Sequence, residues 1–433
     1  MPGIMTYEQT LEYLYSCLPA FHRIGKPAYK SNLDNTLLLD SYFGHPHKKY
    51  RTVHVAGTNG KGSVSHMTAS VLQEAGFVTG LYTSPHLKDF RERIRINGEM
   101  IPKREVTAFV EKHGKIIARH KPSFFEMTVA MAFDYFARKK IDIAVIETGL
   151  GGRLDSTNII NPVLSVITNI GYDHTDLLGN TLVKIAAEKA GIIKSNTPVV
   201  IGESQPETKH IFQTAAAKAG SEIIFSDSNF SCFLKELNLI TGERKYSVKE
   251  KSTDRTITGV TPLGGDYQSK NLQTVFQVFK CLEGTLGLTE QNLTAGIRRV
   301  VLNTGLNGRW QIIERNPLTV CDTGHNREGI EYVVRQISGI PKTGLHIIIG
   351  FVRDKDISSM LPLFPPEARY YFTKAPVPRA MDEKALQTEA LRFNLKGECY
   401  DDVKKALVAA RRAATDTDMI FIGGSTFVVA EVI

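Results

Sequence analysis

A short apolar run leads directly into a glycine-rich loop in the stretch Thr52-Val53-His54-Val55-Ala56-Gly57-Thr58-Asn59-Gly60-Lys61-Gly62-Ser63. The run is typical of a strand, and residues 63–75 that follow it have the pattern of a helix ended by Gly76. In such a unit the loop amides and the helix N-terminus face a bound phosphate, and the helix dipole favours its negative charge. The stretch therefore predicts a nucleotide-phosphate site in which Lys61 contacts the terminal phosphates and Ser63 offers a hydroxyl to phosphate or Mg²⁺.

The loop departs twice from the generic phosphate-loop pattern G-x-x-x-x-G-K-[ST]. Val55 stands where the pattern has its first glycine, and Gly62 separates Lys61 from Ser63. Taken alone, the loop indicates only that a nucleotide phosphate binds, and a plain glycine turn is the alternative.

Short apolar runs alternate with longer amphipathic segments over most of the chain, which is typical of an α/β fold. We expect an N-terminal P-loop-type domain with a mostly parallel sheet and helices on both faces. The first 50 residues read as helical, and further helices are expected at 182–193, 267–282 and 291–300. Strands are expected at 52–55, 78–82, 141–146, 163–168 and 198–201, with a β-rich segment of antiparallel hairpins at about 226–260.

A stretch rich in Asn and Gly at 301–308 predicts a linker between a domain at 1–300 and a smaller one at 309–433. The second domain again alternates strands and helices, so we expect a Rossmann-like α/β unit. Its strands are expected at 318–321, 345–349, 370–373 and 419–422, with helices starting at Arg327, Glu383 and Val403.

Composition narrows the class of protein. The chain has 433 residues and a formal net charge of +8, and no basic tail or stripe concentrates that charge for nucleic acid. The five cysteines are scattered without a C-x-x-C pair, which favours a reducing cytoplasm over a disulfide framework. The N-terminus does not read as a secretory signal, and no apolar stretch is long enough to cross a membrane. We expect a cytoplasmic monomer with small-molecule substrates and no nucleic-acid or membrane partner.

Several further motifs, together with the loop, resemble the folylpolyglutamate synthase and dihydrofolate synthase family of the Mur-ligase superfamily, in its bifunctional bacterial form. The resemblance covers nearly the whole chain, and the motifs stand in the family's order. They are Tyr82-Thr83-Ser84-Pro85-His86-Leu87 with Arg91 to Gly98, Glu147-Thr148-Gly149-Leu150-Gly151-Gly152-Arg153-Leu154-Asp155-Ser156-Thr157-Asn158, Gly171-Tyr172-Asp173-His174-Thr175, Glu188-Lys189-Ala190-Gly191-Ile192, Gly308-Arg309-Trp310 and Asp322-Thr323-Gly324-His325-Asn326.

The resemblance implies an ATP-dependent ligase that works through an acyl phosphate, with ATP as co-substrate and Mg²⁺ as cofactor. It would join L-glutamate to dihydropteroate and add glutamates to the γ-carboxylate of tetrahydrofolate and its polyglutamates. A folylpolyglutamate synthase without the first activity is the alternative within the family. Outside it stand a Mur ligase that builds peptidoglycan and, from another class, a P-loop NTPase that acts as a switch or motor.

Metal ligands are implied at the positions of Ser84, Glu147 and His174. A carboxylate that ends a buried parallel strand, as Glu147 is expected to do, suits Mg²⁺ at the edge where such sheets bind ligands. Lys189 matches a lysine that is carbamylated in the superfamily, although a lysine on a helix is more often simply solvated. Carbamylation requires a neutral amine, and burial would have to lower the pKa of Lys189.

The remaining site residues are also carried over from the family. The loop residues Gly57, Thr58, Asn59, Gly60, Lys61, Gly62 and Ser63 bind ATP, and Asn271, Arg309 and Asp322 are expected to contact its base, phosphate and ribose, respectively. His325 is expected at the reacting centre, with simple helix capping as the other interpretation of Asp322 and Asn326. The pterin pocket is expected to include Ser123, Phe124, Phe125, Glu126, Leu154, Asp155 and Ser156, although adjacent Phe residues are as often part of a core.

Overall fold

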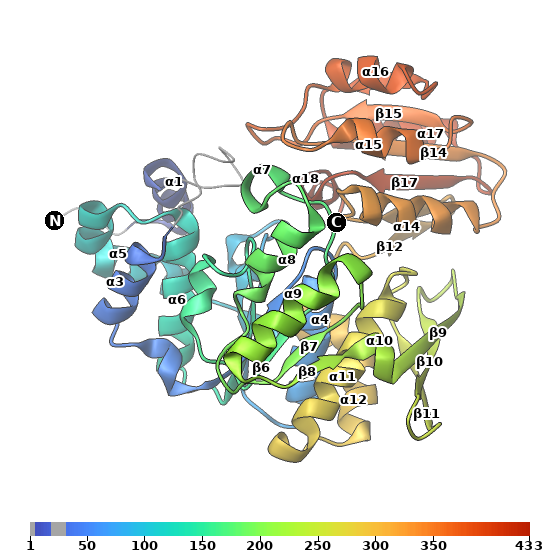
Figure 1. Ribbon diagram of the computed structural model, residues 1–433. Helices are drawn as coiled ribbons and strands as arrows, with labels where there is room; N and C mark the ends of the chain where they lie inside the picture. The colour runs from blue at the N-terminus through green and yellow to red at the C-terminus, as the bar shows by residue number, and fades with distance from the viewer. Residues whose placement is uncertain (1–4, 19–31) are drawn as a thin grey trace.

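The computed structural model describes residues 5–18 and 32–433, which form two α/β units, each built on its own sheet (Figure 1). The segment before the first strand is helical in its described parts, as expected, with α1 (Tyr7–Cys17) and α3 (Asp34–Tyr42). Part of that prediction, at 19–31, lies outside the described residues. None of the helices in the described part of the chain is long and apolar enough to span a membrane.

The larger sheet has eight strands in the order β4-β3-β2-β5-β1-β6-β7-β8. Its strands are β1 (Arg51–Ala56), β2 (Thr79–Tyr82), β3 (Ile94–Ile96), β4 (Glu99–Met100), β5 (Ile143–Glu147), β6 (Leu164–Ile167), β7 (Val199–Ile201) and β8 (Ile223–Phe225). In the sheet order, all pairings from β2 to β8 are parallel, and only the pairings of β3 with β2 and β4 are antiparallel. The prediction of a mostly parallel sheet is therefore confirmed.

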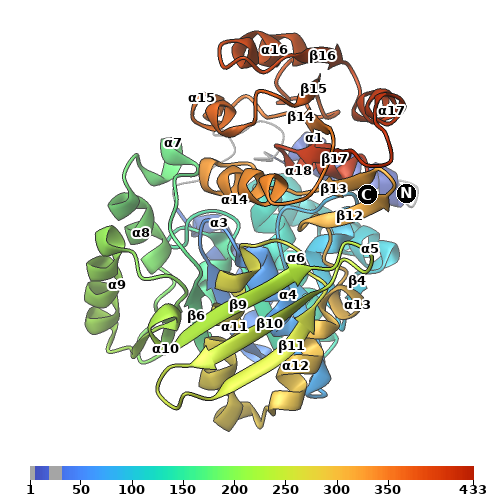
Figure 2. The ribbon, with the colours of Figure 1, turned by 90° about the vertical axis from the view of Figure 1, so that its right-hand side faces the viewer.

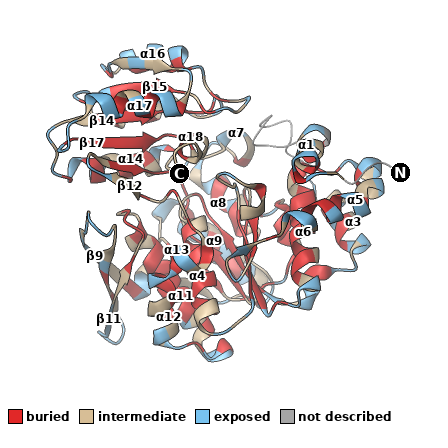
Figure 3. Cartoon of the chain, turned by 180° about the vertical axis from the view of Figure 1, so that it is seen from behind, coloured by how far each residue is buried: buried red, intermediate tan, exposed pale blue. Residues whose placement is uncertain are grey.

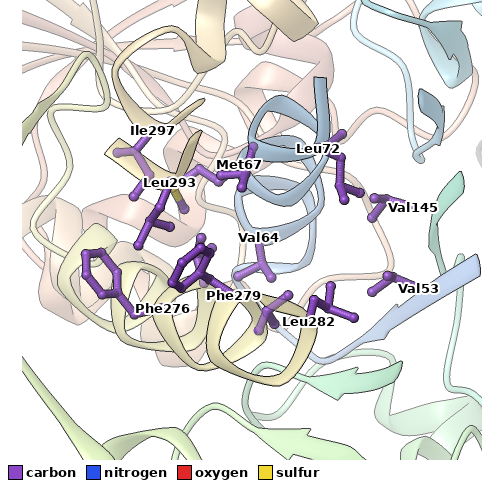
Figure 4. Close-up of a cluster of buried hydrophobic side chains, with 14 of the residues drawn as sticks. Val53, Val64, Met67, Leu72, Val145, Phe276, Phe279, Leu282, Leu293 and Ile297 are labelled. Carbon is purple, nitrogen blue, oxygen red and sulfur yellow. The ribbon is translucent and has the colours of Figure 1, made fainter. Parts of the chain in front are cut away.

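Helices cover both faces of this sheet because successive side chains of a strand point to opposite sides. Val53 and Val145 face a core formed with α4 (Lys61–Glu74), α11 (Gln268–Leu286) and α12 (Glu290–Arg298) (Figure 4). On the other face, Ala144 and Ile146 pack with α6 (Phe124–Arg138) and α5 (Lys103–His120), and Ile167 packs with α8 (Leu182–Ala190) and α9 (Pro206–Ala219). The strands between these layers are almost wholly buried (Figure 3).

The β-rich segment forms a sheet of its own, with three antiparallel strands in the order β11-β10-β9. These are β9 (Phe230–Leu237), β10 (Arg244–Glu250) and β11 (Thr256–Thr261), and the sheet lies against α11 (Figure 2). The expected antiparallel hairpins are therefore confirmed.

The C-terminal sheet has the order β12-β13-β17-β14-β15-β16 and is parallel except for β12. Its strands are β12 (Gln311–Arg315), β13 (Leu318–Cys321), β14 (Leu345–Ile349), β15 (Arg369–Thr373), β16 (Gly397–Tyr400) and β17 (Met419–Gly423). One face packs against α14 (Arg327–Ser338) and α16 (Glu383–Leu391), and the other against α17 (Val403–Ala413) and α18 (Thr426–Ala430). This is the second, smaller α/β unit that the sequence predicts.

The predicted linker at 301–308 is wrong in its first half, because α13 (Val300–Thr304) continues the helical structure there. Polar contacts with α4 explain why a segment without helical periodicity folds this way. Thr304 Oγ1 lies 2.8 Å from His66 Nδ1, and Asn303 donates to Ser70 Oγ at 3.1 Å and to Glu74 Oε1 at 2.7 Å. The irregular connection between the two sheets therefore begins only at Gly305.

Candidate active site

The carboxyl ends of the parallel strands in both sheets meet at one cavity, which is where ligands bind to open α/β sheets. Each of seven strands is followed by a loop that contributes to the cavity wall. These residues are Pro85 after β2, Gly149 after β5, His174 after β6, His325 after β13, Lys355 after β14, Arg379 after β15 and Ser425 after β17.

The phosphate loop follows β1, and two of its glycines are required by its geometry. Gly57 and Gly60 have φ angles of 146° and 84°, which favour glycine. A Cβ at Gly57 would collide with Thr168, and a Cβ at Gly60 would collide with the Asn271 side chain. Close packing against β6 and α11 therefore fixes the course of this loop.

Lys61 begins α4 and folds back over the loop. Its Nζ donates to the carbonyl oxygens of Gly57 at 3.0 Å and Thr58 at 3.1 Å. Asn59 exchanges amide hydrogen bonds with Asn326 of the C-terminal unit, at 2.9 Å from Asn326 Nδ2 and 3.3 Å from Asn59 Nδ2. The loop is therefore in direct contact with both units.

Ser63, at the end of the phosphate loop, contacts α11. Its side chain is buried, and its hydroxyl accepts a hydrogen bond at 3.2 Å from Gln268 Nε2, so it faces α11. Gln268 in turn accepts from Asn271 Nδ2 at 2.8 Å. A hydrogen bond between side chains therefore joins the start of α4 to α11.

Glu147 ends β5, and its carboxylate is suited to a divalent cation. Burial raises its pKa to about 7, and the charges of Lys61 and Arg309 oppose that rise. The only hydrogen bond to this carboxylate within the described part of the chain comes from the Ser84 amide at 3.4 Å. A buried carboxylate that accepts so few hydrogen bonds is suited to bind Mg²⁺, which takes few protein ligands and several waters.

The predicted metal ligands are only partly brought together. Ser84 contacts Glu147 through its amide, and both Ser84 and His174 line the cavity. His174 Nε2 lies 3.8 Å from Asp173 Oδ2, and burial lowers the pKa of His174 to about 3, which leaves a neutral imidazole. The described residues contain no group of three or more His, Cys, Asp or Glu arranged to hold a metal. A bound metal ion would thus have few ligands from the protein.

Lys189 is buried at the end of α8, with 4% of its surface exposed. Its Nζ donates to the Gly57 carbonyl oxygen at 2.7 Å, and burial, followed by the charge of Lys61, lowers its pKa to about 7. The loop after β5 contacts this end of α8, where Arg153 N donates to Glu188 O at 2.7 Å. The neutral amine that carbamylation requires is therefore available near neutral pH.

Arg309 reaches the phosphate loop from the C-terminal unit. Its Nη2 lies 3.2 Å from the position that a Cβ on Gly62 would occupy. Nη1 donates to Gly308 O at 3.3 Å and to the Thr323 hydroxyl. A guanidinium held in this way is placed to meet phosphate oxygens beside the loop.

Asp322 connects the two units by hydrogen bonds to its buried carboxylate. It accepts from Tyr267 Oη at 2.6 Å, from Trp310 N at 2.7 Å and from Gly324 N at 2.7 Å. Asn326, not Asp322, caps α14, because its Oδ1 accepts from Gly329 N at 2.9 Å. The capping interpretation therefore holds for Asn326 alone.

The predicted pterin pocket residues all line the cavity; they are Ser123, Phe124, Phe125, Glu126, Leu154, Asp155 and Ser156. Ser123 and Glu126 also form the capping box of α6, in which Glu126 N donates to Ser123 Oγ at 3.1 Å. The Phe124 ring stacks on Tyr15 with centroids 5.1 Å apart, and the Phe125 ring lies where a Cβ on Gly149 would be. Phe125 is half-buried and gives one wall of the cavity an apolar surface, whereas Phe124 is 2% exposed and belongs to the core behind it.

Comparison with known proteins agrees with this architecture. Residues 55–278 match the family model of the Mur ligase middle domain, and residues 308–426 match that of the Mur ligase glutamate ligase domain. The folylpolyglutamate synthase of Lacticaseibacillus casei is 33% identical over 97% of this chain and 96% of its own. This chain belongs to the folylpolyglutamate synthase and dihydrofolate synthase family of Mur ligases. It is therefore an ATP-dependent ligase that forms carbon–nitrogen bonds.

Other members of the family are similar over their whole length. The dihydrofolate synthase/folylpolyglutamate synthase of Bacillus subtilis is 32% identical over 93% of this chain and 94% of its own. The structure of E. coli FolC in complex with DHPP and ADP matches with a TM-score of 0.85, 27% identity and coverage of 100% and 98%. A bifunctional folylpolyglutamate synthase/dihydrofolate synthase with Mn, AMPPNP and L-glutamate bound matches with a TM-score of 0.83, 25% identity and coverage of 99% and 98%. The folate-type relatives favour this branch over a peptidoglycan Mur ligase or an NTPase motor.

The cationic wall of this family member's cavity was not predicted from the sequence. Lys355 and Arg379 line the cavity from the C-terminal unit, and Lys355 forms an ion pair with the buried Asp173 of the large unit. His325 also faces Asp173, with Nε2 3.4 Å from Oδ2. The sequence does place Lys355 and Arg379 after the ends of predicted parallel strands, and that position could have identified them as residues of the ligand site.

Proposed function

We propose that this protein joins L-glutamate to dihydropteroate, which makes dihydrofolate, and adds further glutamates to the γ-carboxylate of folates. One observation carries the proposal: the same cavity is lined by the half-buried ring of Phe125 and by Lys355 and Arg379, which pair with Asp173 and Asp354. The first suits a flat pterin, and the second suits the carboxylates of glutamate.

The reaction balances without an enzyme nucleophile. A carboxylate oxygen of the pterin substrate attacks the γ-phosphorus of ATP, which gives an acyl phosphate and ADP. The amine nitrogen of glutamate then attacks the acyl carbon, phosphate leaves with the bonding electrons and the nitrogen loses a proton. Lys61 and Arg309 stabilise the charge that develops on the transferred phosphoryl group.

Ser84, Glu147 and His174 would hold Mg²⁺, which supplies positive charge to the phosphate oxygens when it is bound. Glu147 is buried with one hydrogen bond, and the imidazole of His174 is neutral, so both side chains can act as ligands. Lys189 is positioned for carbamylation by CO₂, since its amine is buried and in contact with Gly57.

The relatives support the substrates. DHPP and ADP are present in the E. coli complex, and L-glutamate, Mn and an ATP analogue are present in the bifunctional enzyme. A synthase limited to polyglutamate is the second candidate, because the relative with 33% identity is named a folylpolyglutamate synthase. We further propose a cytoplasmic monomer, in which the free thiols of Cys232, Cys281, Cys321 and Cys399 suit a reducing compartment.

The two candidates are separated by product mass. The protein would be incubated with dihydropteroate, ATP, Mg²⁺ and L-glutamate, and in parallel with tetrahydrofolate in place of dihydropteroate. The proposal requires glutamylated product from both. Product from tetrahydrofolate alone would support the single activity, and absence of product from both would refute the proposal.

A further inference from the structure

A chain of buried polar groups runs from β1 to the wall of the substrate cavity. It begins at His54, which is fully buried and lies three residues before Gly57. His54 Nε2 lies 2.9 Å from the hydroxyl of Thr157, which is also fully buried in the loop after β5. The side chain of His54 therefore joins β1, which leads to the phosphate loop, to the loop that follows the neighbouring strand β5.

The direction of these hydrogen bonds follows from Asp155. Its carboxylate receives bonds from Thr157 N at 3.0 Å, from the Thr157 hydroxyl at 2.5 Å, and from two further backbone amides. Burial raises the pKa of Asp155 and these four donors oppose that rise, so its two oxygens serve as the acceptors of all four bonds. The Thr157 hydroxyl therefore donates to Asp155, and it accepts from the Nε2–H of His54.

This assignment requires a neutral His54 with its proton on Nε2. Full burial, assisted by the charge of Lys194, lowers the pKa of this imidazole to about 3. Nδ1 has no hydrogen-bond partner within the described part of the chain, so Thr157 is the single polar contact of the ring. His54 thus serves as a hydrogen-bond donor only.

The chain ends at the cavity. Asp155 Oδ2 accepts from Gly149 N and Leu150 N, both at 2.8 Å, and both residues line the cavity. The Phe125 ring packs on Gly149, with no room for a Cβ between them. A shift of this pair of amides would therefore move the surface on which the flat substrate is expected to lie.

The far end of the same loop is held by different contacts. Asn158 donates to Gly191 O at 2.9 Å, and its carbonyl oxygen accepts from Lys194 Nζ at 2.7 Å. These bonds do not involve His54 or Asp155. These attachments of Asn158 are separate from the side-chain contacts of His54, Thr157 and Asp155, which end at the amides of Gly149 and Leu150.

We propose that His54 and Thr157 are positioning residues that act through Asp155 to fix the Gly149–Leu150 wall and thereby set affinity for the pterin-bearing substrate. The inference rests on the proposed function for the identity of that substrate. Neither residue touches the substrate itself. The imidazole and the hydroxyl act by orienting a carboxylate whose Oδ1 accepts from Thr157 and whose Oδ2 holds the wall.

Four variants test the chain. His54→Leu and Thr157→Val remove the hydrogen bond at nearly constant volume. His54→Gln keeps an N–H donor close to the position of Nε2, and Thr157→Ser keeps the hydroxyl. Thermal unfolding identifies any variant that fails to fold. If His54→Leu does not fold, the isosteric Thr157→Val removes the same hydrogen bond and can be measured in its place.

The first measurement is amide hydrogen exchange, which needs no ligand. Exchange at the Gly149 and Leu150 amides should rise about tenfold in His54→Leu and Thr157→Val, while exchange in the loop at 57–63 stays unchanged. The two conservative variants should stay close to wild type. Unchanged exchange at 149–150 in both folded disruptive variants would overturn the proposal.

The second measurement is binding of dihydropteroate and of ADP by calorimetry. The disruptive variants should bind dihydropteroate about fivefold to tenfold more weakly and ADP within about twofold of wild type. The double variant should lose no more than the worse single one, because both act in one chain. Equal losses for both ligands, or wild-type dihydropteroate affinity, would contradict the proposal. If wild type does not bind dihydropteroate at all, the proposed function fails, and the exchange measurement still decides the positioning chain.

Discussion

The side-chain nitrogen of Lys189 donates a hydrogen bond at 2.7 Å to the carbonyl oxygen of Gly57, a residue 132 positions earlier in the chain. The contact joins the end of α8 to the first residue of the phosphate loop. It is formed by a fully covered amine whose pKa burial lowers to about 7. A cation buried this deeply is costly, so the neutral amine is the form that the fold favours near and above neutral pH.

Lys189 should take up CO₂ in a pH-dependent way. Because its pKa is lowered to about 7, the amine is mostly neutral above that pH and mostly protonated below it. With ¹³C-labelled bicarbonate, a carbamate signal should be present at pH 8 and should fall steadily as the pH drops below 7. Lys189→Ala should lose activity and regain part of it with formate or acetate. A fully active Lys189→Ala without additive would remove the residue from the mechanism.

Lys61→Ala should lower kcat by about a thousandfold or more, because the loop loses the positive charge that stabilises the negative charge on the transferred phosphoryl group. Its carbonyl partners at Gly57 and Thr58 also lose a donor, so ATP affinity should fall as well. The exposed Lys218 provides a matched control, and Lys218→Ala should keep wild-type kinetics. Near-normal turnover in Lys61→Ala would separate the loop from catalysis.

Arg309→Ala should lower kcat by about a hundredfold, with a smaller rise in the KM for ATP, since the guanidinium approaches the loop at Gly62. Arg309→Lys should restore little, because an ammonium cannot form the planar fork that binds two oxygens. The exposed Arg412 serves as the control, and Arg412→Ala should leave steady-state kinetics unchanged. An Arg309→Ala enzyme with wild-type kcat would show that this side chain does not act on the transferred group.

Phe125→Ala should raise the KM for dihydropteroate about tenfold and change the KM for ATP by less than about twofold. The ring forms part of the cavity wall and covers Gly149, so its loss removes the flat surface and leaves a void. Phe125→Leu keeps some apolar contact, so its KM for dihydropteroate should lie between those of wild type and Phe125→Ala. Equal increases in both KM values would show instead that the mutation disturbs the whole site.

Much of the fold could be predicted because its strands are buried on both faces. Such strands appear as short continuous apolar runs, and the observed bounds of β13 and β14 agree with the runs at 318–321 and 345–349. The edge strand β16 was missed, since its residues are half-exposed and carry no such run. α13 was missed because contacts of Asn303 and Thr304 with α4 stabilise it, and a local pattern does not contain them.

The site shows the same division between local and tertiary information. The motifs identified which residues meet, and Phe124, Phe125, Ser84 and His174 do line one cavity. They did not indicate that the Ser63 hydroxyl accepts a hydrogen bond from Gln268, or that both oxygens of Asp155 accept hydrogen bonds from residues of its own loop. Those facts depend on how α11 and the loop after β5 pack, which no spacing in the sequence specifies.

The most direct test of the ligase account is the dependence of steady-state ATP consumption on both other substrates. ADP release would be measured with dihydropteroate alone, with L-glutamate alone and with the two together, and the product would be weighed by mass spectrometry. The account predicts sustained ADP release only with both, in step with a product whose mass equals dihydropteroate plus glutamate minus water. ATP hydrolysis that ignores both compounds, or that responds to DNA or RNA instead, would contradict it.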